Sequence, residues 1–170
     1  CLSRGLGDVY KRQDVEGLNP RSVQGDRVIG EQLARLTRPG PAELDVSQCP
    51  DLVPPLAAMA ALRAGETTAI VNAARLRIKE SDRLASVTQV LNALGADVEE
   101  HADHLVLRGR ERLAGGVTVS GHNDHRIAMM AAIAATRCQG PVTITGAECV
   151  NKSYPRFWAC LLYTSDAADD

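Results

Sequence analysis

Aromatic residues and long apolar runs are both scarce in this sequence. Aromatic side chains make up 3% of the 170 residues, whereas 45% of the residues are hydrophobic. A core built mainly from Ala, Val, Leu and Ile is typical of an α/β interior. No apolar run approaches the length that spans a bilayer, and no charged-then-apolar signal segment opens the chain. We therefore expect a cytoplasmic protein without a membrane partner.

The chain also lacks a strong net charge and a clustered set of cysteines. Its formal net charge is −2, so no chain-wide field attracts nucleic acid. The five cysteines include no CxxC pair, which favours reduced thiols over a disulfide framework. His101 and His104 fall in an expected surface turn, and we interpret them as turn residues, not metal ligands. No glycine-rich nucleotide motif is present. We therefore predict neither a metal nor a cofactor.

The two ends of the chain differ in character from its middle. Residues 1–13 are basic and have no periodicity, and residues 160–170 begin apolar and end acidic. Both resemble translated adapters of a sequencing library, which should be left out of fold reasoning. We therefore expect residues 14–159 to be the native part of the chain, with its true start and stop missing.

Between these ends, helical and strand patterns alternate. Apolar residues at helical spacing predict helices over residues 22–36, 50–66, 81–94 and 124–138. Alternating or β-branched segments predict strands over residues 14–20, 42–46, 67–73, 116–120 and 141–146, with a hairpin over 96–109 and a loop over 149–157. This order predicts an α/β protein with helices layered on a mixed sheet, and it hints at a repeated unit of about 70 residues.

Cap residues are expected at the start of three of these helices. Asp51 can cap the second helix, with two prolines in its first turn. Ser81 can cap the third helix, and Asn123 or Asp124 the fourth. Exposed N–H groups at such helix starts favour phosphate and carboxylate groups.

Polar clusters occur where these elements end, which is where sheet proteins place their ligands. They are Asp45 in LDVSQCPD, the run RLRIKESDR at 75–83, the triplet DHR at 124–126, and Lys152. Taken singly, each cluster has a simple structural explanation as a solvated helix start, a cap or a loop lysine. Taken together, the separated cations can hold small anions in bidentate fashion.

Six segments resemble the EPSP synthase (3-phosphoshikimate 1-carboxyvinyltransferase) family, in the same order along the chain. They are LNPRSVQGD (18–26), LDVSQCPDLVP (44–54), RLRIKESDRL (75–84), LNALGADVE (91–99), NDHRIAMM (123–130) and CVNKSYPRFW (149–158). KESDRL and DHRIAM are the most specific of these motifs. The resemblance covers most of the family's C-terminal domain and none of its N-terminal domain.

This resemblance implies both a fold and a reaction. The family fold is an inside-out α/β barrel of two domains, each with repeated βαβαββ units. The family transfers the enolpyruvyl group of phosphoenolpyruvate to the 5-hydroxyl of shikimate 3-phosphate, a step of the shikimate pathway toward aromatic amino acids. The implied partners are these two substrates and the N-terminal domain of the same enzyme.

The resemblance also implies roles for individual residues. Asp45 matches the aspartate that contacts the 5-hydroxyl of shikimate 3-phosphate and is a candidate base. Glu80 matches the glutamate proposed to move a proton at the methylene carbon, and Lys79 the lysine near the shikimate hydroxyls. The residues that match the cations holding phosphoenolpyruvate are Arg83, Arg126 and Lys152. His125 is interpreted as a spacer or cap.

Two departures limit the carry-over. Arg75 stands where some members have an asparagine that contacts the shikimate phosphate, and the anion-binding residues of the N-terminal domain are absent. We therefore predict that the 170-residue chain alone is inactive. Two alternatives remain: the related UDP-N-acetylglucosamine enolpyruvyl transferase, whose pattern lacks KESDRL and DHRIAM, and a non-catalytic anion-binding module.

Overall fold

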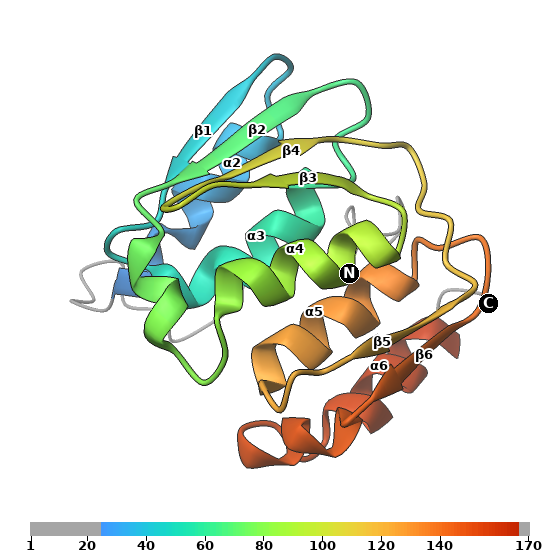
Figure 1. Ribbon diagram of the computed structural model, residues 1–170. Helices are drawn as coiled ribbons and strands as arrows, with labels where there is room; N and C mark the ends of the chain where they lie inside the picture. The colour runs from blue at the N-terminus through green and yellow to red at the C-terminus, as the bar shows by residue number, and fades with distance from the viewer. Residues whose placement is uncertain (1–24, 167–170) are drawn as a thin grey trace.

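The computed structural model describes residues 25–166 and contains two sheets separated by helices (Figure 1). The four-stranded sheet has the order β1-β2-β4-β3, and the two-stranded sheet pairs β5 with β6. The strands are β1 (Ala42–Asp45), β2 (Thr67–Val71), β3 (Asp97–Glu100), β4 (Leu105–Arg108), β5 (Val117–Ser120) and β6 (Val142–Thr145).

Helices of two kinds connect these strands. The α-helices are α2 (Ile29–Leu36), α3 (Val53–Ala60), α4 (Arg83–Ala93), α5 (His125–Ala135) and α6 (Phe157–Asp166). Short 3-10 helices are η1 (Gly25–Val28), η2 (Pro50–Leu52), η3 (Ala74–Ile78) and η4 (Ala147–Lys152). No helix among residues 25–166 is long and apolar enough to cross a membrane.

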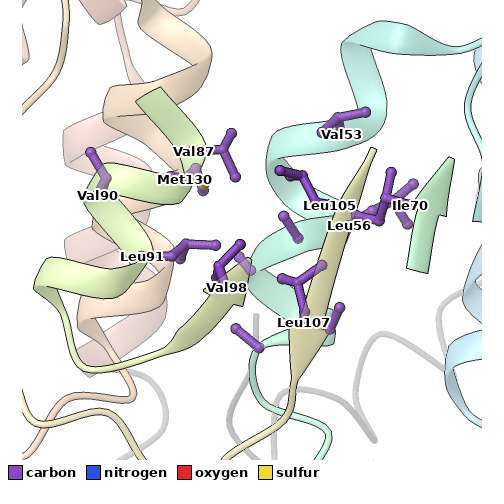
Figure 2. Close-up of a cluster of buried hydrophobic side chains, with 14 of the residues drawn as sticks. Val53, Leu56, Ile70, Val87, Val90, Leu91, Val98, Leu105, Leu107 and Met130 are labelled. Carbon is purple, nitrogen blue, oxygen red and sulfur yellow. The ribbon is translucent and has the colours of Figure 1, made fainter. Parts of the chain in front are cut away.

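One face of the four-stranded sheet is buried. Alternate residues of a strand point to the same side of the sheet, so the buried side chains share this face. Leu44 of β1 is in register with Ile70 of β2, and both side chains are fully buried. Leu105 and Leu107 of β4 continue this buried row. Figure 2 shows these leucines facing the apolar side chains of α3 and α4. The helices therefore cover a single face of the sheet, as Figure 1 also shows.

The order of the elements places two similar units in sequence. In the first unit, α3 connects the parallel strands β1 and β2, and α4 then leads to the antiparallel hairpin of β3 and β4. In the second unit, α5 connects the parallel strands β5 and β6. Parallel pairs need such a helical crossover. The mixed α/β architecture predicted from the sequence is thereby confirmed.

Most of the predicted helices and strands are present, with shifted ends. The hairpin over 96–109 forms, and the predicted loop over 149–157 contains the last four residues of η4 and the first residue of α6. The strand predicted over 14–20 and the predicted tail 1–13 lie outside the described residues. The boundary predicted between residues 159 and 160 falls within α6.

Two of the predicted helix caps are wrong, and one is confirmed. The N-cap of α4 is Asp82, whose Oδ1 accepts a hydrogen bond from the amide of Ala85 at 3.1 Å, so Ser81 does not cap it. Asp51 lies in η2 and makes no cap hydrogen bond, because its oxygens accept from side chains far along the chain. Asp124 caps α5 as predicted.

Candidate functional site

Asp51 lies at the centre of a cluster of charged side chains. Its Oδ1 accepts a hydrogen bond from Nη1 of Arg83 at 2.8 Å and lies 3.5 Å from Nζ of Lys79. Its other oxygen, Oδ2, accepts from Nη2 of Arg126 at 2.9 Å. One carboxylate therefore joins cations from the segment after η3 and from the first turns of α4 and α5.

Arg83 is the buried core of this cluster. Its side chain is fully buried, and each of its three nitrogens donates to a different carboxylate. Nε donates to Asp124 at 2.8 Å, Nη1 to Asp51, and Nη2 makes a short hydrogen bond to Glu80. Charge-assisted contacts of this kind offset the cost of removing a guanidinium from water.

Asp124 links the starts of α4 and α5. Its side chain is fully buried, and Oδ2 accepts from Arg83 and from the Ser81 hydroxyl at 3.2 Å. Its Oδ1 accepts from the amide of Arg126 at 3.0 Å, which is the cap of α5. The residue expected only as a cap thus also holds the buried arginine.

The neighbouring cations keep the partly buried Asp51 and the fully buried Asp124 ionised. Burial alone would raise the pKa of Asp51, but the charge of Arg126 and the hydrogen bond from Arg83 bring it below its ordinary value. Burial would likewise raise the pKa of Asp124, and the hydrogen bond and charge of Arg83 lower it. Nearby positive charge outweighs desolvation at both positions.

Three charged side chains around Asp51 are partly open to solvent. Glu80 is 51% exposed, so its carboxylate reaches solvent while it contacts Arg83. Lys79 and Arg126 are 31% and 33% exposed. Nε of Arg126 is buried and has no hydrogen-bond partner within residues 25–166. An entering anion would therefore meet Lys79 and Arg126 first, with Arg83 behind them.

Lys152 adds a cation beside the cluster. Its Nζ donates to Oδ1 of Asn123 at 2.8 Å, next to Asp124, and the side chain is exposed. Asn123 and its neighbour His122 have φ values of 52° and 51°, a backbone conformation that costs energy for residues other than glycine. Such strain often accumulates at functional loops. This loop follows β5 and leads into the DHR triplet, which caps and begins α5.

Asp45 does not contact this cluster. It ends β1, its side chain is exposed, and Oδ1 accepts from the amide of Ser47 at 2.9 Å. Hydrogen bonds from the Ser47 backbone, from the Ser47 side chain and from Asn72 lower the pKa of Asp45. Asp45 is therefore an ionised carboxylate at the carboxyl end of β1. Asp51 lies six residues further along the chain, in η2.

The structure brings Lys79, Glu80, Arg83 and Arg126 together as expected, but around a residue that the sequence did not single out for this role. Asp51 was expected only as a helix cap. A carboxylate at the start of a helix after a buried strand can either cap the helix or pair with cations. The local sequence does not distinguish these two roles. Its charge partners were visible only as separate basic motifs.

Two further expected residues have no partner in the cluster. His125 is half-buried at the start of α5, and Arg75 is exposed in η3. The His101 and His104 rings stack with their centroids 4.1 Å apart, in the turn between β3 and β4. In the described part of the chain, no group of three His, Cys, Asp or Glu residues is arranged to hold a metal ion.

A protein-family model matches nearly the whole described chain. The matching family is EPSP synthase (3-phosphoshikimate 1-carboxyvinyltransferase), and the match covers residues 17–161. The matched range includes every charged residue of the cluster around Asp51.

Curated relatives carry the same name. The 3-phosphoshikimate 1-carboxyvinyltransferase of Clostridium acetobutylicum is 52% identical over 161 residues, covering 87% of this chain and 37% of that protein. The protein of that name from Clostridioides difficile is 44% identical over 156 residues, covering 83% of this chain and 36% of that protein. The chain therefore spans little more than a third of the length of these relatives.

Solved structures agree with this comparison. A structure of EPSP synthase from Acinetobacter baumannii superimposes with a TM-score of 0.61 at 37% identity, covering 66% of this chain and 26% of that chain. A second structure from the same organism gives a TM-score of 0.55 at 34% identity.

Proposed function

The chain belongs to the EPSP synthase family, and we propose that it forms part of an enzyme that transfers the enolpyruvyl group of phosphoenolpyruvate to the 5-hydroxyl of shikimate 3-phosphate. The observation that supports this proposal most directly is the meeting of Lys79, Arg83 and Arg126 at one carboxylate, with Glu80 on the same arginine. Cations suit two phosphorylated acids, and a carboxylate beside them suits proton transfer.

The reaction requires two proton movements and one leaving group. The 5-hydroxyl oxygen bonds to C2 of phosphoenolpyruvate, the hydroxyl loses its proton, and C3 gains one to become a methyl group. The resulting tetrahedral ketal then loses a proton from that methyl group, and the bond from C2 to the phosphate oxygen breaks. The products are the enolpyruvyl ether and inorganic phosphate.

We assign the chemistry as follows. Glu80 moves the proton at C3, which its exposure to solvent permits. Asp45, as an ionised carboxylate, is the candidate base for the 5-hydroxyl, and Lys79 contacts the shikimate hydroxyls. Arg126 and Lys152 bind the carboxylate and phosphate of phosphoenolpyruvate.

Arg83 was expected to hold phosphoenolpyruvate as well. Its complete burial and its three carboxylate partners support a further role in setting the arrangement of the others. For Arg83 to contact substrate, one of these three carboxylates must move away. Glu80, the most exposed of them, is the natural one to move.

We further propose the domain organisation implied by the family. Residues 14–159 form most of the C-terminal domain, and an N-terminal domain completes both the site and the inside-out barrel. The β1-α3-β2-α4-β3-β4 order of the first unit fits the βαβαββ repeat of that fold. The flanking segments 1–13 and 160–170 are proposed to be foreign. The cysteines in the described part of the chain are thiols that form no disulfide, which supports the proposed cytoplasmic location.

A chimeric enzyme tests this proposal. Residues 17–161 of the chain replace the matching segment of the Clostridium acetobutylicum relative, and phosphate release is measured with phosphoenolpyruvate and shikimate 3-phosphate. We expect turnover with shikimate 3-phosphate and none with UDP-N-acetylglucosamine. The 170-residue chain alone should be inactive. A folded chimera that binds both substrates without turnover would instead favour a non-catalytic anion-binding module.

A further inference from the structure

Asp51 has a structural position that no assigned role in the reaction explains. It is the only carboxylate within residues 25–166 that pairs with Lys79, Arg83 and Arg126 at once. Lys79 and Arg83 lie four residues apart in one segment, whereas Arg126 lies in the first turn of α5, and Asp51 is the carboxylate that all three share. Without Asp51 these like charges would repel each other more strongly, because Glu80 and Asp124 pair only with Arg83.

We propose that Asp51 is a positioning residue of the enolpyruvyl-transfer site, whose carboxylate sets the placement of Lys79 and Arg126 before phosphoenolpyruvate enters. This inference rests on the function proposed above. It adds a residue that touches no reacting atom and acts through two cations that do. Catalytic sites gain most from cations that are already in place when the substrate arrives.

The geometry indicates that Lys79 and Arg126 still have hydrogen-bond donors available when they are paired with Asp51. Arg126 gives only Nη2 to Asp51, and its other terminal nitrogen, Nη1, makes no hydrogen bond within the described residues. Lys79 approaches Asp51 at 3.5 Å, and an ammonium group carries three donors. Both cations therefore keep donors for an incoming carboxylate or phosphate while Asp51 holds them.

The contact with Arg83 prevents Asp51 from moving away. If Asp51 moved, Nη1 of the fully buried Arg83 would lose its charged partner, which is costly inside a protein. An entering anion is thus expected to join this arrangement and not to displace Asp51. Removal of the Asp51 charge should then weaken anion binding, although it also removes a negative charge from the site.

Charge balance supports the same conclusion. Lys79, Arg83 and Arg126 face the three carboxylates of Asp51, Glu80 and Asp124. Lys152 adds a cation that is held only by Asn123 among its hydrogen-bond partners in the described chain. The cluster is therefore close to neutral when empty, and correct placement of its donors matters more for recognition than excess charge.

The test uses the chimeric enzyme with Asp51→Asn and Asp51→Glu substitutions. Asp51→Asn removes the charge at nearly constant size, and we expect the KM for phosphoenolpyruvate to rise about tenfold while kcat changes less than about threefold. Asp51→Glu keeps the charge and should restore part of the loss. Should the Asn variant fail to fold, a KM that is raised in the Glu variant at unchanged kcat gives the same support.

The matched control is Asp97→Asn. Asp97 also bridges two cations through its two oxygens, with Arg108 at 3.2 Å and Arg110 at 3.5 Å, but it lies on the hairpin strand β3. Its substitution should leave KM and kcat unchanged. This control shows whether a change in KM is specific to Asp51 or follows the removal of any carboxylate that bridges two cations.

Each other outcome counts against a specific claim. An unchanged KM in both Asp51 variants, with only the melting temperature lowered, would make Asp51 a purely structural residue. A lowered KM in Asp51→Asn would show that Asp51 competes with substrate for the cations. If the chimera without substitutions is active and either of these two KM results is found, only the proposed role of Asp51 is overturned. If that chimera is inactive, the result counts against the proposed function and against the role of Asp51 that rests on it.

Discussion

Asp51 and Arg126 lie 75 residues apart in the sequence, yet Oδ2 of the first accepts a hydrogen bond from Nη2 of the second at 2.9 Å. This contact joins the segment after β1 to the first turn of α5, and so connects the two similar units of the fold. The packing of α3 against α5 brings these helix starts together. The candidate site is therefore a product of contact between the units.

Replacement of the buried Arg83 by Met should unfold the chain more easily. The substitution leaves the fully buried Asp124 without its ion-pair partner and removes one of the three cations that pair with the partly buried Asp51. We expect a loss of about 3–5 kcal/mol in the free energy of unfolding. Urea denaturation followed by circular dichroism measures it. Arg108→Met is the control, because Arg108 is 52% exposed and its ion pairs should contribute less than about 1 kcal/mol.

Replacement of Glu80 by Gln in the chimera should slow the reaction with little effect on substrate binding. The amide keeps a hydrogen-bond acceptor for Arg83 but cannot move a proton at C3. We expect kcat to fall about 100-fold or more, as for the loss of an acid–base group. Glu100→Gln is the control, since Glu100 also accepts from an arginine, Arg77, at 2.7 Å. Equal rates for the two variants would remove Glu80 from the chemistry.

The stability advantage of Asp124 over Asn at this position should depend on pH. The folded protein lowers the pKa of Asp124, so its ionised form contributes stability that is complete above about pH 5. This contribution is lost as the pH falls through the lower, folded-state pKa. Urea midpoints from pH 7 to pH 3 should therefore differ most between the native chain and Asp124→Asn at neutral pH, and converge in acid. A difference for Asp124→Asn that stays constant from pH 7 to pH 3 would contradict the prediction.

An added methyl group at Gly109 should disrupt the contact between the segment after α3 and the residue that follows β4. A Cβ at this position would lie 1.9 Å from the carbonyl oxygen of Arg63, closer than any real contact allows. We expect Gly109→Ala to cost about 1–3 kcal/mol or more in the free energy of unfolding. Gly30→Ala is the control in α2, where no atom lies within 4 Å and the substitution should be neutral or stabilising by up to about 1 kcal/mol. Similar unfolding free energies for both variants would argue against the tight contact.

The periodic parts of the fold could be predicted because their signals are local. The alternation in residues 67–71 and 97–108 is produced by neighbouring residues that face opposite sides of one sheet. The apolar spacing in α4 and α5 reflects one buried helix face in the same way. The ends of these elements were less accurate, and the cap of α4 was displaced by one residue to Asp82.

The candidate site could be predicted only in part. Lys79, Glu80 and Arg83 lie together in one segment, so the sequence alone placed them near each other. The complete burial of Arg83 and the central position of Asp51 could not be read from it, because the carboxylates that hold Arg83 include partners 32 and 41 residues away. A charged residue near a helix start has the same local pattern whether it faces solvent or a buried ion pair.

The helices, the strands, the small aliphatic core and the motifs that identify the family could be read from the sequence, because each depends on residues close together in the chain. The packing of the chain in space sets which carboxylate each cation meets. It also decided that Asp45 stays apart from the cluster and that Arg83 has no access to solvent. The physical reason is that ion pairing depends on distance in space, and the packing of α3, α4 and α5 sets those distances.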